Sequence, residues 1–130
     1  MKHLLRAAAA LLPCFVLGFV LAGLVPLAGC HSYQIQCTVK NRTGAPIELV
    51  EVDYPEASFG IDSLANGADY GYRFKVRGSG PVTVQYTVAA THALVKAKGP
   101  DVREGQQGTL EIVLMPGGTA EFYPQLNTGR

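Results

Sequence analysis

The sequence predicts an all-β fold, namely an antiparallel β-sandwich of about seven strands, of immunoglobulin-like or fibronectin-like type, after an N-terminal signal helix. After residue 30, apolar and polar residues alternate with a period of two in several short runs. Turn-forming clusters of glycine, proline and asparagine separate these runs, and none of them shows a helical period. A small closed barrel built from the same strands is the alternative fold.

The first two runs predict two strands that differ in regularity. Residues 33–40 alternate strictly, and the predicted inward side chains are Tyr33, Ile35, Cys37 and Val39. Residues 41–44 then predict a turn, so we interpret the Asn-X-Thr sequon at Asn41 as turn chemistry and not as a glycan site. In the next run, 46–54, the alternation changes phase between Leu49 and Val50, which predicts a β-bulge or a crossing between sheets.

The stretch 56–67 loses the strand period and ends in the strong turn signal Asn66-Gly67. We therefore predict a loop in which Phe59 and Leu64 plug the end of the core. Loops carry function more often than strands, so this loop is the first candidate for a partner-binding surface.

Residues 70–76 and 82–88 alternate clearly on either side of a Gly-Ser-Gly turn, and they predict a β-hairpin. The outer face of the first run carries the cations Arg73, Lys75 and Arg77. This row is a candidate site for an anionic ligand such as lipopolysaccharide or peptidoglycan. The alternatives are a solvated strand face or a charged sheet edge that discourages further pairing.

The last third of the domain alternates more weakly. It predicts, in order, a strand at 91–98, a polar loop at 99–108, a strand at 109–115, a short strand near 120–123 and a flexible tail at 125–130. The sandwich domain is thereby predicted to span 33–124.

The N-terminal segment reads as an export signal. Lys2, His3 and Arg6 form a positive start, and no charged residue follows from position 7 to position 29. An uncleaved membrane helix is the alternative, because such a run is long enough to span a bilayer. Interior proline and glycine residues weaken that alternative.

Leu27-Ala28-Gly29-Cys30, at the end of the apolar run, resembles the lipobox of bacterial lipoproteins. The resemblance implies a signal peptide at 1–29, cleavage between Gly29 and Cys30, and lipid (diacylglyceryl and palmitate-like acyl chains) on Cys30. Residues 30–32 would then be the lipid-anchored N-terminus. Stable anchoring needs two or more acyl chains, which lipoproteins of this type carry.

The expected location is the cell envelope, at the outer membrane and facing the periplasm, with the inner membrane or the cell surface as alternatives. His31 stands where aspartate would direct enteric lipoproteins to the inner membrane.

Charge and cysteine content limit the possible functions. Nine basic and ten acidic residues follow Cys30, which leaves a formal charge of −1 and argues against nucleic-acid binding. Cys37 is the third cysteine, after one in the signal and the lipobox cysteine, so no disulfide within the domain is expected. Its place among inward residues predicts a buried thiol.

No stretch of the sequence assembles a catalytic or metal-binding motif. His31 and His92 have no motif around them, and Glu51 and Asp53, which share a strand face, are interpreted as solvent-facing rather than as a calcium site. We therefore expect no enzyme activity, no metal and no cofactor. The predicted function is a lipid-anchored binding or structural module for an envelope protein or anionic envelope polymer. The alternative is a small envelope enzyme or enzyme inhibitor.

Overall fold

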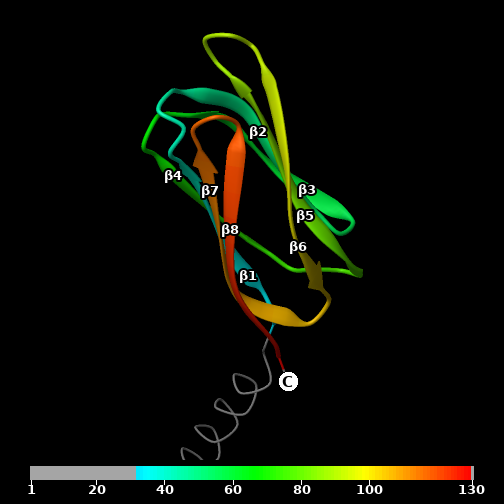
Figure 1. The fold of residues 1–130 in the computed structure, drawn as a ribbon. Helices are drawn as coiled ribbons and strands as arrows, with labels where there is room; N and C mark the ends of the chain where they lie inside the picture. The colour runs from blue at the N-terminus through cyan, green and yellow to red at the C-terminus, as the bar shows by residue number, and fades with distance from the viewer. Residues whose placement is uncertain (1–31, 130) are drawn as a thin grey trace, which may run out of the picture. The chain divides into compact units, whose positions relative to one another are not determined.

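The structure, a computed structural model, describes residues 32–129 and contains two four-stranded β-sheets (Figure 1). Contacts divide the chain into Met1–Ser32 and Tyr33–Arg130, and all the strands among the described residues belong to the second unit. The predicted signal helix, the cleavage site at Gly29 and the lipidation site at Cys30 lie outside the described residues. The strands are β1 (Ile35–Asn41), β2 (Ile47–Tyr54), β3 (Ala57–Leu64), β4 (Asp69–Phe74), β5 (Ser79–Val88), β6 (Leu94–Arg103), β7 (Gln106–Met115) and β8 (Thr119–Thr128).

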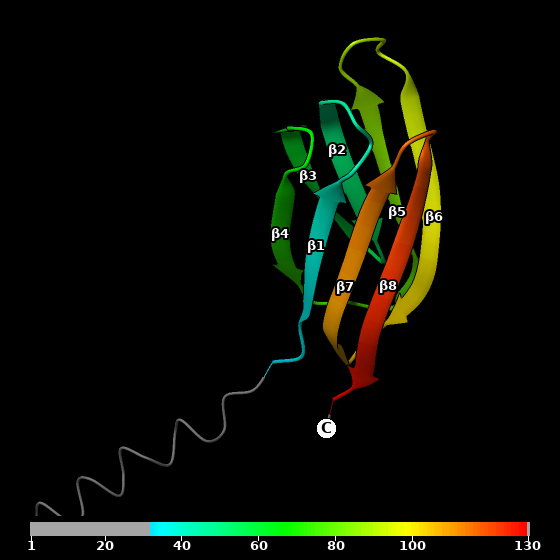
Figure 2. The same cartoon turned by 60° about the vertical axis from the view of Figure 1, so that its left-hand side comes forward.

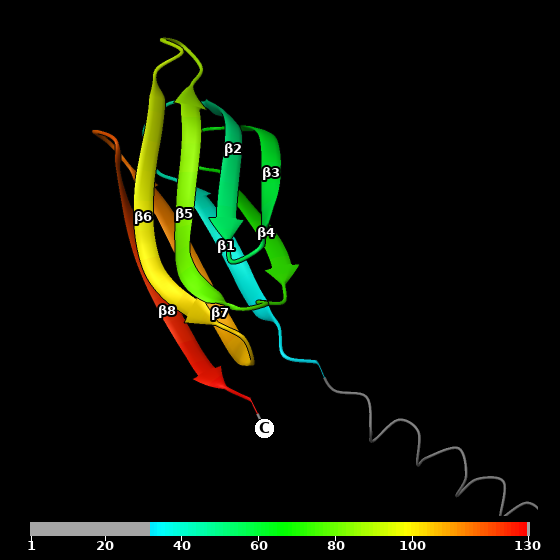
Figure 3. The ribbon, with the colours of Figure 1, turned by 90° about the vertical axis from the view of Figure 1, so that its right-hand side faces the viewer.

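The two sheets face each other as a sandwich, which confirms the predicted all-β architecture. Sheet A has the order β4-β1-β7-β8 and lies in front in Figure 2; sheet B has the order β3-β2-β5-β6 and lies in front in Figure 3. Strands β1 and β7 run parallel, whereas all other neighbours are antiparallel, so the sandwich is not purely antiparallel. Constant-type immunoglobulin domains place strands one, two, four and five together, and the division into sheets here is different.

Strand β3 is the one strand that the sequence analysis did not predict, and it corrects the prediction of a loop at 56–67. Residues 57–64 pair antiparallel with β2, and only a tight turn at Pro55-Glu56 separates the two strands. Phe59 and Ile61 face the core, while glycine and serine occupy the outer side of this edge strand. Such small outer residues have low strand propensity, which is why the period was not apparent from the sequence.

The predicted hairpin at 70–88 is wrong, because β4 and β5 lie in different sheets. Strand β4 pairs with β1, and β5 pairs with β2 and β6. Residues 75–78 carry the chain from one sheet to the other, and within this crossing the side chain of Val76 is only 1% exposed. A buried residue midway through the connection suits a crossing, in which the chain passes over the end of the core.

The last three strands are longer than predicted. Strand β6 runs through the predicted loop to Arg103, and β8 continues to Thr128, paired with Gln106 of β7. The predicted flexible tail is therefore wrong for residues 125–128, because their backbone groups join the sheet A ladder.

The phase change in β2 is a β-bulge, which was one of the two structures predicted for it. The β2–β5 register shifts between Glu48 and Glu51, and Leu49 takes φ +51° and is 66% exposed. The extra residue turns outward, so that Ile47 and Val50, three positions apart, both reach the core.

The core lies between the sheets, and aromatic rings close its two long sides. Its buried apolar residues come from strands β1 to β7 and from the connection between β4 and β5, whereas β8 contributes partly buried side chains. The buried residues are Ile35, Cys37, Val39, Ile47, Val50, Val52, Phe59, Ile61, Leu64, Phe74, Val76, Val82, Val84, Tyr86, Val102, Leu110, Ile112 and Leu114. On the β6–β8 side, Phe122 lies so close to Gly99 that a Cβ there would sit 2.5 Å from the ring. On the β3–β4 side, Phe59 stacks on Tyr72 at 4.3 Å, and Tyr54 stacks on Phe74 at 4.0 Å.

The two ends of the sandwich are formed by different turns and connections. At one end, which we call the Tyr33 end, the chain enters β1, the β6–β7 turn bonds to Gly129, and the 75–78 crossing bonds to Glu104 (Figure 2). At the other, which we call the Asn41 end, lie the 41–46 and 64–69 turns and the protruding β5–β6 hairpin.

Candidate binding surfaces

Two of the five predicted partner-binding residues are core residues. Phe59 and Leu64 are 7% and 5% exposed, and both side chains point from β3 toward sheet A. Neither can contact a partner while the domain is folded, so the loop surface expected around them does not exist. Leu64 was expected to plug the end of the core, and it lies at the Asn41 end in that role.

The three predicted cations are exposed but do not form one strand face. Arg73 lies on edge strand β4, and its Nε donates to Gln36 Oε1 at 3.3 Å. Lys75 and Arg77 follow in the crossing between the sheets, at the Tyr33 end. The row is thus wrapped around one corner of the sandwich, where Glu104 Oε1 also accepts a bond from the Gly78 N–H at 3.1 Å.

Asn41 forms a fully buried structural hub, which the sequence analysis recorded only as a turn residue. Its Nδ2 lies 2.9 to 3.1 Å from the carbonyl oxygens of Ala45, Leu64 and Ala65. Its Oδ1 accepts from the backbone N–H and the hydroxyl of Thr43, at 3.0 and 2.7 Å. The sequon amide is therefore engaged and inaccessible, which agrees with its interpretation as turn chemistry.

The remaining reactive side chains of the described domain are dispersed. Cys37 is fully buried, as predicted, and burial raises the pKa of its thiol from 9.0 to about 12. His92 is exposed in the β5–β6 hairpin. Within residues 32–129, no three His, Cys, Asp or Glu side chains gather closely enough to hold a metal ion.

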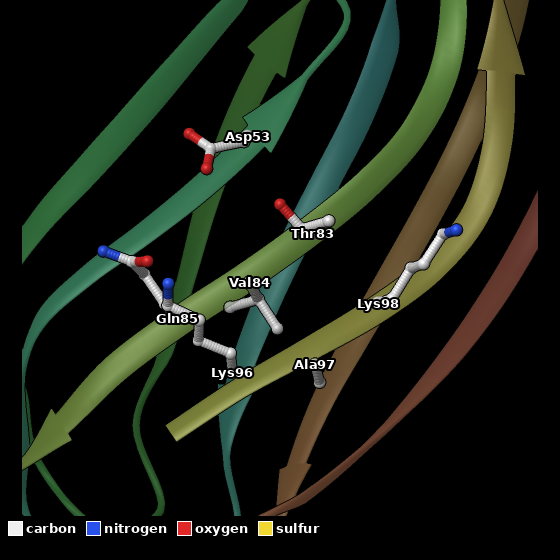
Figure 4. Close-up of a pocket in the computed structure, with 7 residues that line it drawn as sticks. All are labelled: Asp53, Thr83, Val84, Gln85, Lys96, Ala97 and Lys98. Carbon is white, nitrogen blue, oxygen red and sulfur yellow. The ribbon is translucent and has the colours of Figure 1, made fainter. Parts of the chain in front are cut away.

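The outer face of sheet B contains a shallow hollow of about 430 Å³ lined by charged and polar side chains together with the apolar residues Val84 and Ala97 (Figure 4). Asp53 and Thr83 are register partners, as are Thr83 and Lys98. In Figure 4, Lys96 extends along β5 toward Gln85, whereas Lys98 extends away from Asp53. The charged groups of this face therefore do not converge on one point, and the hollow has the character of a solvated, mixed-charge surface.

The outer face of sheet A has a different chemistry. A second hollow of about 240 Å³ is lined mainly by uncharged polar side chains from β1, β7 and β8. We call this surface the amide face, and we define it by Gln36, Thr38, Thr109, Tyr123 and Gln125. Arg73 and Gly71 border it on β4, through their pairing with Gln36 and Thr38. The sequence analysis missed this surface because its residues come from three strands that are distant in sequence.

No known protein-family profile matches the chain, and no curated protein is significantly similar to it. Among solved structures, the chain is similar to the NMR structure of the protein from Eubacterium rectale, with 13% identity and a TM-score of 0.53. The match covers 75% of this chain and 96% of that chain. At this identity the likeness concerns the fold alone, and it supports the two-sheet β architecture. Within residues 32–129, no helix is long and apolar enough to cross a membrane.

Proposed function

We propose that this protein is a lipid-anchored cell-envelope module that binds a partner without catalysing a reaction. The observation that carries the proposal is the lipobox-like Leu27-Ala28-Gly29-Cys30, followed after two residues by Tyr33, the first residue of the sandwich unit. A cysteine at the junction of an apolar run and a folded β-domain is where a lipid anchor would be attached.

The anchor would hold the Tyr33 end of the domain close to a membrane. From Cys30 to Tyr33 there are three peptide steps, and a fully extended chain spans at most about 3.6 Å per residue, or roughly 11 Å in all. The amide face and the Asn41 end would remain free for a partner. The expected site is the outer membrane on its periplasmic side, because His31 follows the cysteine.

The architecture suits binding in the way that many surface domains of this class bind. We propose that the domain belongs to the broad group of immunoglobulin-like and fibronectin-like sandwiches, whose members have two packed sheets but not always the same topology. Such domains present sheet faces, edges and end loops to their partners. An anionic envelope polymer is the proposed ligand of the cation row, Arg73, Lys75 and Arg77, all of which are exposed.

The anchor is tested by mass spectrometry of the mature protein from its native membrane. We expect an N-terminal Cys30 carrying diacylglyceryl and acyl groups, and we expect Cys30→Ala to abolish lipidation. An intact Met1 in the wild type, or an unmodified Cys30, would refute the lipoprotein assignment.

Partner binding is tested by retention on purified envelope material. Exposed charges are screened over about 8 to 10 Å at moderate ionic strength, so retention through the cation row should weaken as salt rises. The double variant Arg73→Glu and Lys75→Glu should lose retention and still unfold at the wild-type temperature. Lys96→Glu with Lys98→Glu, on the outer face of sheet B, is the matched control. An equal loss of retention in both double variants would show that only the net charge of the protein matters, and it would contradict a role for the cation row.

A further inference from the structure

The amide face lies on two straight rows of register partners that cross the four strands of sheet A. The first row follows the register Arg73–Gln36–Thr109–Gln125, and the second follows Gly71–Thr38–Glu111–Tyr123. Neighbouring strands lie about 4.8 Å apart, so each row spans roughly 14 Å. The two rows border the hollow and present their groups on one nearly continuous surface.

The polar groups of the amide face are largely unused within the domain. Among the described residues, the side chains of Thr38, Thr109 and Gln125 have no hydrogen-bond partner, and Gln36 has only the bond from Arg73. An amide offers both donors and acceptors, and a hydroxyl does the same. The face can therefore exchange several hydrogen bonds with a ligand that carries many hydroxyl or amide groups.

Tyr123 provides the apolar part of this surface. It is 51% exposed although it is a large aromatic residue, and it borders the hollow beside Thr109 and Gln125. The negative charge of neighbouring Glu121 and a side-chain hydrogen bond to that carboxylate both raise the pKa of Tyr123. An aromatic ring with a hydroxyl group suits a ligand that has one apolar face and polar, hydrated groups around its edge.

The charges of this side of the sandwich balance locally. Lys40 Nζ lies 3.2 Å from Glu111 Oε1, and Arg42 lies 2.8 Å from Asp69. Glu121 and Arg73 add one charge of each sign at opposite edges of the sheet. A strongly charged ligand gains little from such a surface, whereas a neutral ligand rich in hydroxyl groups loses little on binding to it.

From these four features, we infer that the amide face binds a polysaccharide chain, with a sugar ring packed on Tyr123 and neighbouring sugar hydroxyl or acetamido groups bonded to Gln36, Thr109 and Gln125. Sugar rings combine C–H groups on one face with hydroxyl groups at the rim, which matches an exposed aromatic ring set among amides and hydroxyls. The inference rests on the proposed envelope location and adds a second, uncharged binding surface beside the cation row.

The test is co-sedimentation of the detergent-solubilised full-length lipoprotein with insoluble chitin and with purified peptidoglycan sacculi, at 0.1 M and 1 M NaCl. We expect binding to at least one of these glycans. The part that the amide face provides should persist at 1 M NaCl because its contacts are uncharged, whereas any part that the cation row provides should be lost. Tyr123→Ala should lower the association constant at least tenfold, and Gln125→Ala several-fold. Tyr123→Phe should stay within about threefold of the wild type, because it keeps the ring.

Matched controls lie on the opposite sheet. Thr83→Ala and Gln85→Ala remove a hydroxyl and an amide from the outer face of sheet B, and both should bind as the wild type does. Equal binding by Tyr123→Ala and the wild type, or no binding to either glycan, would overturn the inference. Binding to sacculi that is lost at 1 M NaCl and on reversal of Arg73 and Lys75, but is insensitive to Tyr123→Ala, would overturn it while leaving the proposed envelope-binding function intact.

Discussion

Replacement of Asn41 by alanine should destabilise the domain more than any other polar substitution in its turns. The Asn41 side chain is fully buried at the end of β1, and it bonds to the 43–45 turn and to the end of β3. It therefore joins a strand of sheet A to a strand of sheet B through hydrogen bonds. The substitution would leave these partner groups without their amide and open a small space among them.

The magnitude follows from the burial of each partner. The Leu64 carbonyl is buried, and leaving such a group unpaired costs about 1 to 3 kcal/mol. The carbonyls of Ala45 and Ala65 and the groups of Thr43 are only partly buried, so water restores part of their bonding. Together these losses predict about 3 to 4 kcal/mol, a large share of the roughly 5 to 15 kcal/mol that stabilises a typical domain.

The assay is urea denaturation followed by far-ultraviolet circular dichroism, with Asn66→Ala as the matched control. Asn66 Oδ1 accepts an exposed bond from the Gly44 N–H at 3.2 Å, so its loss should cost less than about 1 kcal/mol. Asn41→Asp removes the donor and buries a carboxyl group, whose folded pKa would be raised. Its stability should consequently improve as pH falls. If Asn41→Ala costs no more than Asn66→Ala, the hub does not join the sheets as argued.

Three further substitutions test the core, the bulge and the β6–β8 side. Cys37→Ser should cost about 1 to 3 kcal/mol and native Cys37 should resist thiol reagents at pH 8, because the folded thiol has a pKa of about 12. The unfolded thiol ionises from about pH 9, whereas the folded thiol stays protonated up to about pH 12. The free energy of unfolding should therefore fall between pH 9 and 12, by up to about 1.4 kcal/mol per pH unit relative to Cys37→Ala, and an equal pH dependence in the two proteins would contradict the burial of Cys37. Leu49→Gly should stabilise the domain by about 0.5 to 1 kcal/mol in thermal melts, because Leu49 has φ +51°, whereas Leu94→Gly, in an ordinary exposed strand position, should destabilise it. Gly99→Ala should cost about 1 to 3 kcal/mol because its Cβ would meet the Phe122 ring, and an unchanged melting temperature would show that the ring can move aside.

Much of the inward-facing pattern could be predicted from the sequence, because a strand's side chains alternate whatever its partners are. Ile35, Cys37 and Val39 were expected inside and are fully buried. The phase change at Leu49 predicted either a bulge or a crossing between sheets, and the bulge that is present brings Ile47 and Val50 to the same face. These features depend on the order of neighbouring residues, and the sequence contains that order completely.

The candidate sites were less predictable, because a binding surface depends on which strands lie side by side. The cations Arg73, Lys75 and Arg77 were expected on one strand face, and the crossing after β4 distributes them around a corner. The amide face joins residues as distant as Gln36 and Gln125, and β7 lies between their strands. No local pattern in the sequence indicates that neighbourhood.

The sequence by itself therefore determined the all-β class, the alternating core residues, the buried thiol and the phase change within β2. Only the tertiary structure decided which strands share a sheet. The alternation around 70–88 is the same for a hairpin as for two strands in opposite sheets, and the buried Val76 distinguishes them only once the core is assembled. Likewise, the small outer residues of β3 and the polar residues of β8 form strands because β2 and β7 offer them unpaired backbone groups, a condition that long-range packing creates.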